Sequence, residues 1–288
     1  MINWSGHLTK MEHFLGGMPM PEYKISETSH LFYLYSPPQT SGLSTFVFFN
    51  PLTGDTSSWE GVIAPRLREK GFGTLSFDYR GQTQSPFSPE DQLTTELIVE
   101  DSISLMAAVN PENPVFVGLS IGGLFAARAW LAGAAAKGLI LINMLRKDGP
   151  RLQWIGDALV RAVEIGGLEL FRDLYLPLLM NEEWLKGNRE NFIQTPASYA
   201  PLAADSGAYK LLSEGGPSAD WDLPYEKLTL PTLVVTGLQD HVFLEPDVVD
   251  ELFSRLPRAE RINMEDAGHL IPGEQPDKLV NILAGFKA

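Results

Sequence analysis

The sequence predicts an α/β protein: a doubly wound, mostly parallel sheet with a helical cap inserted after the sixth strand. Apolar runs of strand length alternate with helix-like segments along most of the chain, and this alternation stops between residues 145 and 228. Continuous apolar runs are typical of strands buried on both faces, and their alternation with helices favours a parallel sheet covered on two sides. The 288 residues, 44% of them hydrophobic, suit one large core with an insertion.

Six apolar runs are expected to form the central strands, and helix-like segments lie between them. The expected strands span residues 45–50, 73–77, 115–119, 138–143, 232–236 and 261–264. The expected helices span residues 58–70, 93–109, 121–136, 246–256 and 275–286. An alternating aromatic stretch at residues 31–35 predicts an antiparallel strand at the N-terminal edge of the sheet.

The insertion is expected to form a cap over the binding edge of the sheet. Residues 145–228 show no strand period and contain helical pieces at 152–164 and 168–179, followed by loops rich in proline and glycine. Open α/β sheets bind ligands at the carboxyl ends of their strands, and a helical insertion between two strands usually lies there. We therefore expect a core of residues 1–144 and 229–288 and a cap of residues 145–228.

Ser120 lies between Gly118 and Gly122 at the point where an apolar strand gives way to a helix. This G-x-S-x-G spacing is typical of a nucleophile elbow, in which glycines let strand and helix pass close together. The pentapeptide alone is a weak signal, so the interpretation depends on its strand-turn-helix context. The elbow predicts an exposed serine hydroxyl.

A serine hydroxyl needs a base and a group that orients the base before it can act as a nucleophile. His269 follows the last expected strand, and Asp240 follows the strand before it, so both belong to the edge of the sheet where Ser120 lies. The sequence predicts Asp240 as the acid and His269 as an exposed base. His7, His13 and His30 lie in the N-terminal lead-in and are expected to be surface or packing residues.

Two backbone amides are candidate donors to the oxyanion that forms during acyl transfer. One belongs to Ile121, the residue after the serine. The other belongs to Leu52 in the loop after the strand at residues 45–50, because Pro51 has no N–H and its fixed φ helps to aim the next amide. A plain turn before the following helix is the alternative for this loop.

The expected cap is rich in large apolar side chains that could form a substrate pocket. We select Trp154, Met180 and Trp184, together with His241 beside the predicted acid, as substrate-binding candidates. Ordinary packing inside the cap explains the three cap residues equally well. Packing or substrate contact suits His241 better than catalysis does.

Composition excludes several classes of function. The chain has no cysteine, so thiolate catalysis and thiolate metal sites are impossible. A formal charge of −14 opposes binding to nucleic acid and to anionic lipid. The N-terminus lacks the pattern of a signal peptide, and no long apolar run occurs, so we expect a cytoplasmic protein without membrane insertion. Neither a metal nor an organic cofactor is implied, and the oligomeric state is not predicted.

These motifs together resemble the α/β-hydrolase fold family over most of the chain outside the cap. The elbow, the acid loop ending at Asp240, the Ala-Gly-His loop at His269 and the order Ser, Asp, His all match. The turn from Asp78 to Ser85 is also similar to one of the family, with Thr83 in place of a glycine, and the resemblance implies a structural role for Asp78 and Arg80. At the oxyanion loop the chain has Asn50-Pro51 where the family usually has His-Gly.

The expected function is hydrolysis of small carboxylic esters through an acyl-enzyme on Ser120. Relatives of this fold also transfer acyl groups or cleave lactones, thioesters and carbon–carbon bonds, so these reactions remain alternatives. A non-catalytic receptor of the same fold is a further alternative, although a binding pocket has no need of all three catalytic groups. Dehalogenases and epoxide hydrolases of this fold need an aspartate at the elbow, which Ser120 excludes.

Overall fold

The computed structural model describes residues 21–193 and 197–288, so His7 and His13 lie outside the described residues. Within this part of the chain one eight-stranded sheet has the order β1-β2-β4-β3-β5-β6-β7-β8. The strands are β1 (Glu22–Lys24), β2 (His30–Ser36), β3 (Thr45–Phe49), β4 (Gly73–Phe77), β5 (Pro114–Leu119), β6 (Gly138–Ile142), β7 (Thr232–Gly237) and β8 (Ala259–Met264). Strands β3 to β8 are parallel, and β1 and β2 are antiparallel to their neighbours.

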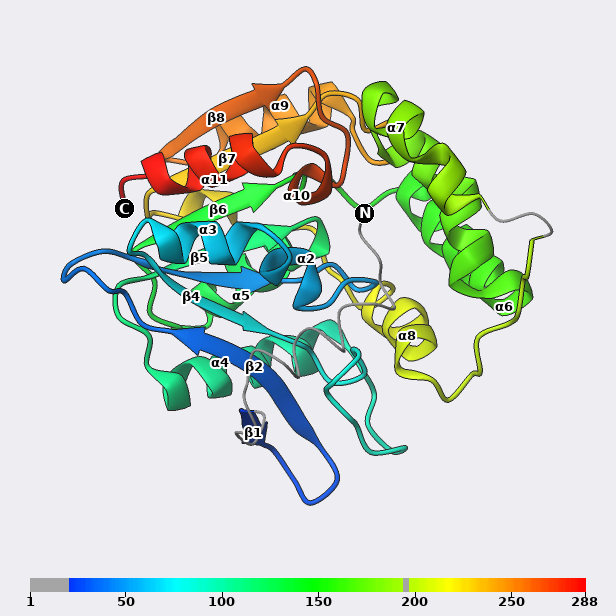
Figure 1. Ribbon diagram of the computed structural model, residues 1–288, viewed down its shortest axis with the longest axis horizontal. Coiled ribbons are helices and arrows are strands. Elements are labelled where there is room, and N and C mark those ends of the chain that lie inside the picture. The colour runs from blue at the N-terminus through cyan, green and yellow to red at the C-terminus, as the bar shows by residue number, and fades with distance from the viewer. Residues whose placement is uncertain (1–20, 194–196) are drawn as a thin grey trace.

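Helices cover both faces of the sheet. One face is covered by α4 (Thr95–Val109), α5 (Ile121–Leu131) and α9 (Pro246–Ser254). The other is covered by α2 (Ser57–Glu60), α3 (Ile63–Glu69), α10 (Ile271–Glu274) and α11 (Pro276–Gly285), with α3 and α11 in front of the sheet in Figure 1. Along β3, Val47 and Phe49 join the first core while Phe46 and Phe48 join the second. The predicted doubly wound fold is therefore confirmed.

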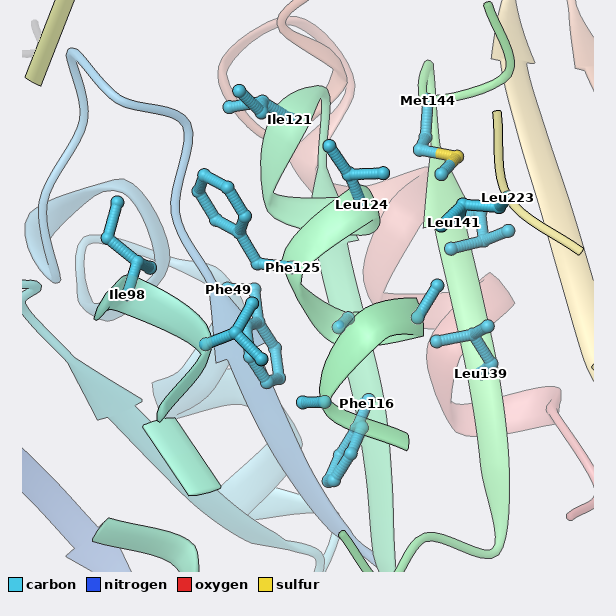
Figure 2. Close-up of a cluster of buried hydrophobic side chains, with 14 of the residues drawn as sticks. Phe49, Ile98, Phe116, Ile121, Leu124, Phe125, Leu139, Leu141, Met144 and Leu223 are labelled. Carbon is cyan, nitrogen blue, oxygen red and sulfur yellow. The ribbon is translucent and has the colours of Figure 1, made fainter. Parts of the chain in front are cut away.

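The helix after the elbow is fixed by one of these cores. In Figure 2 Phe125 of α5 points toward Phe49 of β3 and Leu124 lies on the side of Leu141 of β6, and these side chains are fully buried. Burying a side chain of this size contributes roughly 1.5–3 kcal/mol. The start of α5, where Ser120 lies, is consequently held on a rigid platform.

The insertion after β6 is helical. It contains α6 (Pro150–Leu179), α7 (Glu182–Phe192), α8 (Gly207–Lys210), the π-helix η1 (Leu211–Gly215) and the 3-10 helix η2 (Tyr225–Lys227). The first three helices lie beyond the carboxyl ends of the parallel strands (Figure 1). The two helical pieces expected at residues 152–164 and 168–179 are parts of α6, which kinks at Gly167 with a φ of 66°. A Cβ at Gly167 would overlap the carbonyl oxygen of Ala200, so the kink allows a close approach that only glycine permits.

The last part of the insertion packs against the core. Leu211, Trp221, Leu223 and Tyr225 are buried and belong to the same cluster as α4 and α5. The cap boundaries at residues 145 and 228 stay a prediction. No helix in the described part of the chain is long and apolar enough to cross a membrane.

Candidate active site

Ser120 occupies a strained turn between β5 and α5. Its φ and ψ are 56° and −127°, a conformation that non-glycine residues rarely adopt and that costs about 1–3 kcal/mol. The Ser120 amide donates to the carbonyl oxygen of Ile142 at 2.8 Å, which ties the turn to β6. A Cβ at Gly118 would overlap the backbone of Gly122 and Gly123, and one at Gly122 would overlap the carbonyl oxygen of Phe49. The two glycines of the motif therefore make the turn possible.

The structure brings Asp240 and His269 together. The distance between Asp240 Oδ2 and His269 Nδ1 is 2.6 Å, and Asp240 Oδ1 accepts hydrogen bonds from the amides of Val242 (3.0 Å) and Phe243 (2.9 Å). Burial acts to raise the pKa of Asp240, but His269 and the Phe243 amide outweigh it and hold that pKa below its ordinary value. The carboxylate is thus arranged to accept a hydrogen bond from the Nδ1–H group of the imidazole.

The side chain of Ser120 is hydrogen bonded to a residue that the sequence analysis missed. Arg146 Nη2 donates to Ser120 Oγ at 3.1 Å and to the carbonyl oxygen of Asn143 at 2.7 Å. The hydrogen bonds among residues 21–193 and 197–288 include none between Ser120 and His269. A Ser-His-Asp triad therefore stays a prediction.

Both reactive side chains are buried, whereas the sequence analysis expected an exposed hydroxyl and an exposed imidazole. Ser120 is 7% exposed and His269 4% exposed. The ring of Phe243 lies 4.9 Å from the imidazole of His269, and the guanidinium of Arg146 lies over the same phenyl ring. These neighbours cover the site, and no sequence motif predicts them.

Asn143 is a second residue that the sequence analysis missed as a contributor to the site. It has a left-handed φ of 49° directly after β6. Its Nδ2 donates to the carbonyl oxygens of Gly268 (3.0 Å) and His269 (2.8 Å), and its Oδ1 accepts from the amide of Gly237 (2.7 Å). One side chain therefore ties the loop that carries the acid to the loop that carries the base.

Backbone from the cap also contacts the acid and base loops. The amide of His269 donates to the carbonyl oxygen of Leu179 at 2.5 Å, and the amide of His241 donates to that of Leu178 at 2.9 Å. A Cβ at Gly268 would overlap the Leu179 carbonyl oxygen. The end of α6 thus rests directly on both loops.

Glu274 of α10 completes this contact with a half-buried carboxylate. It accepts hydrogen bonds from the amides of Asn181 (2.6 Å), Gly268 (2.8 Å) and Leu270 (2.9 Å) and from Asn181 Nδ2 (2.8 Å). Burial raises the pKa of Glu274, although these donors oppose the rise. Glu274 therefore joins the cap to both sides of His269.

The expected oxyanion donors lie in a loop and a helix start that are both well fixed. Leu52 and Ile121 are each 8% exposed, and neither amide donates a hydrogen bond to another described residue. The loop carbonyl of Pro51 accepts from Gln82 Nε2 at 3.0 Å and from the Gly54 amide at 3.0 Å. The role of the Leu52 and Ile121 amides stays a prediction.

The Asn50-Pro51 pair has a structural explanation. Asn50 is fully buried, its Nδ2 donates to the carbonyl oxygen of Phe77 (2.8 Å) and to Gln82 Oε1 (2.9 Å), and its Oδ1 accepts from Trp59 Nε1 (2.8 Å). An asparagine has the donor and acceptor pair that these three partners need. Asn50 therefore anchors the oxyanion loop to β4 and α2.

The turn from Asp78 to Ser85 is held by charges and backbone amides. The Arg80 guanidinium donates twice to Asp101, at 2.7 and 2.9 Å, and once to Asp91 at 3.0 Å. Asp78 accepts from the amides of Thr56 (2.7 Å) and Gln84 (3.3 Å). Burial, together with nearby Asp55, raises the pKa of Asp78 to about 7. All these contacts are internal to the protein.

The four substrate-binding candidates do not gather around Ser120. Trp154 is 75% exposed and lines a surface hollow together with His241, and Ser120 is not among its lining residues. Trp184 packs against Phe192 inside the cap, with ring centroids 5.3 Å apart. Met180 is buried beside the base loop. Their contact with substrate stays a prediction.

Acidic and histidine side chains do not cluster into a metal site. The described residues contain no group of three or more His, Asp or Glu side chains that could hold a metal ion.

The sheet is open and mostly parallel, the serine elbow follows β5, and the loops with Asp240 and His269 follow β7 and β8. This arrangement is typical of the hydrolase class of α/β folds. A model of the alpha/beta hydrolase family matches residues 46–282, and the chain belongs to this family.

Relatives of the chain include enol-lactonases and esterases. The 3-oxoadipate enol-lactonase 1 of Acinetobacter baylyi is 27% identical over 246 residues, which cover 83% of this chain and 87% of that protein. The enol-lactonase from Burkholderia xenovorans LB400 has a TM-score of 0.71 and 21% identity over 92% of this chain and 98% of that one. A thermophilic esterase from Thermogutta terrifontis has a TM-score of 0.71 and 22% identity over 93% of this chain and 97% of that one. These two structures share the fold.

Proposed function

We propose that the protein hydrolyses carboxylic esters through an acyl-enzyme intermediate, with Ser120, His269 and Asp240 as a catalytic triad. The observation that carries the proposal is the 2.6 Å contact between Asp240 and His269, placed by β7 and β8 at the sheet edge where the elbow holds Ser120. A buried carboxylate on Nδ1 orients the ring so that Nε2 is the nitrogen available to a hydroxyl. A histidine that served only to pack the core would not require a buried carboxylate bonded to Nδ1.

The proposed reaction has two halves. His269 Nε2 removes the proton from Ser120 as Oγ attacks the carbonyl carbon, and the amides of Leu52 and Ile121 stabilise the oxyanion. His269 then gives the proton to the leaving alcohol, and a water molecule releases the acid by the same steps. Asp240 stabilises the imidazolium that forms in each half.

Cyclic esters are the second candidate substrate. The support is the 27% identity to an enol-lactonase over 83% of the chain. A lactone meets the same nucleophile, base and oxyanion donors as an open ester, but its leaving alkoxide remains attached to the acyl group. A substrate panel therefore needs both open and cyclic esters.

The test is hydrolysis of p-nitrophenyl acetate by the wild type and by Ser120→Ala. We expect the variant to lose at least about 10³-fold in kcat, because the nucleophile is gone. Ser254→Ala is the matched control: this exposed serine lies at the end of α9, and its hydroxyl donates only to the carbonyl oxygen of Glu251. Wild-type labelling by a fluorophosphonate probe is expected at Ser120. Turnover retained in Ser120→Ala would overturn the proposal, and so would labelling at another residue.

A further inference from the structure

A buried guanidinium without a carboxylate partner lies against Ser120. Arg146 is 6% exposed, and no ion pair in the described part of the chain includes it. Arg80 is equally buried at 7% but pairs with both Asp91 and Asp101. The Nε of Arg146 is buried and has no hydrogen-bond partner among the described residues. Asp240 is near enough to act on Arg146 but pairs with His269 instead. Because buried cations in proteins are normally paired directly, Arg146 is available to an anion from outside the protein.

The position of Arg146 is fixed by neutral groups. Its guanidinium lies over the ring of Trp221, 4.7 Å from the centroid, and over that of Phe243 at 4.5 Å. Nη2 also donates to the carbonyl oxygen of Asn143. Burial lowers the pKa of Arg146 to about 10, with Asp240 opposing the drop, so the side chain is still charged at neutral pH. Aromatic faces and a carbonyl oxygen hold the cation, and no described carboxylate forms an ion pair with it.

We infer that Arg146 binds a carboxylate of the substrate, so that the site prefers esters or lactones that carry a free carboxylate near the scissile carbonyl. The inference rests on the proposed function and specifies its substrate class. A guanidinium presents its N–H groups in a planar fork that matches the two oxygens of a carboxylate. The substrate carboxylate then forms an ion pair with Arg146, which no described carboxylate of the protein does.

Geometry limits where the carboxylate stands on the substrate. Nη2 lies 3.1 Å from Ser120 Oγ. A reacting carbonyl carbon approaches the nucleophile to about 3 Å, and a carboxylate oxygen sits about 2.8 Å from a guanidinium nitrogen. A half-ester of succinic acid, whose two carbonyl carbons are separated by three bonds, is short enough to meet both groups at these distances.

Binding of such a carboxylate also changes the partner of Ser120. Nη2 now donates to Oγ, and a substrate oxygen that takes over this donor releases the hydroxyl. The released Oγ can then turn toward Nε2 of His269. A neutral amide oxygen competes for Nη2 more weakly than a carboxylate does, so the carboxylate both positions the ester and frees the nucleophile more effectively.

The test compares kcat/KM for monoethyl succinate and ethyl succinamate, which differ only in carboxylate against neutral amide. We expect the wild type to favour the carboxylate by roughly 10- to 100-fold, the range for hydrogen bonds to a charged group. Arg146→Gln should bring the ratio to about 1, and Arg146→Lys should retain part of it. Arg255→Gln is the matched control, because that guanidinium also lies over an aromatic ring, at 5.3 Å from Tyr225, but pairs with exposed Glu226. It should keep the wild-type ratio.

Two results would overturn the inference: equal use of the two esters by the wild type, or an equal loss on both esters in Arg146→Gln. The wild-type ratio stands as a test even where Arg146→Gln fails to fold. Succinate should also inhibit the wild type competitively and more strongly than succinamide. Hydrolysis of p-nitrophenyl acetate that depends on Ser120, without any carboxylate preference, would reject only the role of Arg146. Absence of Ser120-dependent hydrolysis on every ester would reject the proposed function itself.

Discussion

The two halves of the site are held in different ways. The oxyanion half, residues 50–55, is anchored by Asn50 and Gln82 to β4 and α2, and these contacts lie within the core. The acid–base half, the loops that carry Asp240 and His269, is bound by cap backbone at Leu178 and Leu179. We therefore expect the position of the cap to affect the loops of Asp240 and His269 through backbone hydrogen bonds, and residues 50–55 only through the side chain of Leu52, which lies against Gly215.

This arrangement links the proposed base to the cap. The amide of His269 and the carboxylate of Glu274 both bond to the segment from Leu179 to Asn181. We expect that breaking these bonds would loosen the loop that carries the imidazole.

Two glycines offer the strongest test of the comparison. A Cβ at Gly122 would overlap the carbonyl oxygens of Phe49 and Asn50, all within the core, whereas one at Gly268 would overlap the carbonyl oxygen of Leu179 in the cap. Gly122→Ala is expected to lower the free energy of unfolding by about 4 kcal/mol or more, because neither strand nor helix can yield. Gly268→Ala should lower it by roughly 1–3 kcal/mol but reduce kcat on p-nitrophenyl acetate about 10- to 100-fold, since the base loop must move.

Urea denaturation and steady-state kinetics measure both effects. Gly156→Ala in α6 is the control, because a Cβ there meets nothing within 4 Å. It should keep both stability and turnover. Equal loss of stability in Gly122→Ala and Gly268→Ala would show that the cap is as rigid as the core, and the comparison would fail.

Much of the fold and the positions of the expected catalytic residues could be predicted because each depends on local patterns. Apolar runs place the six parallel strands, and the carboxyl-end rule places Asp240 and His269 in loops at one edge. Strand β1 was missed because its three residues, Glu22–Lys24, carry no apolar pattern. Helix α5 ends at Leu131 rather than at residue 136, since Gly133 has a left-handed φ of 101°.

Arg146, Asn143 and Glu274 could not be predicted as functional residues from the motifs alone. Their roles depend on contacts with segments more than a hundred residues away or with the cap, as between Asn143 and His269. One signal was available: Asn143 and Arg146 follow β6 directly, and β6 pairs with the strand that carries Ser120. Applied to every central strand, the carboxyl-end rule would have selected this loop as well.

Two asparagines give a second, smaller test. Asn50→Ala removes hydrogen bonds to Trp59 Nε1, the Phe77 carbonyl oxygen and Gln82 Oε1, of which Gln82 Oε1 keeps the Tyr79 amide as a donor. We expect a loss of roughly 3 kcal/mol in unfolding free energy. Asn143→Gly keeps the left-handed backbone but removes three hydrogen bonds from the acid and base loops. It should cost only about 1–2 kcal/mol yet lower kcat roughly 10-fold, with an altered pH profile for the base.

The kinetic pH profile separates positioning from general weakening. A displaced imidazole changes the apparent pKa of the basic group in kcat/KM, whereas a merely destabilised protein keeps that pKa and loses active molecules. An unchanged profile in Asn143→Gly, together with unchanged kcat, would show that the acid–base half does not depend on Asn143.

Asp78 gives the smallest expected effect and tests whether the oxyanion half is coupled to the whole fold. Burial raises its pKa to about 7, while an aspartate in an unfolded chain titrates near about 4. Between these values the folded protein holds a proton that the unfolded chain has lost, so this group makes the protein less stable as pH rises from 4 to 7.

Asp78→Asn removes this dependence. The unfolding free energy of the variant relative to the wild type should therefore rise by roughly 2 kcal/mol between pH 5 and pH 7. Urea denaturation at pH 5, 6 and 7 measures the difference, and Asp157→Asn, an exposed aspartate of α6, should show no trend. A flat difference for Asp78→Asn would mean that Asp78 is ionised in the folded protein throughout this range. A rise would show that the turn beside the oxyanion half responds to pH through global stability.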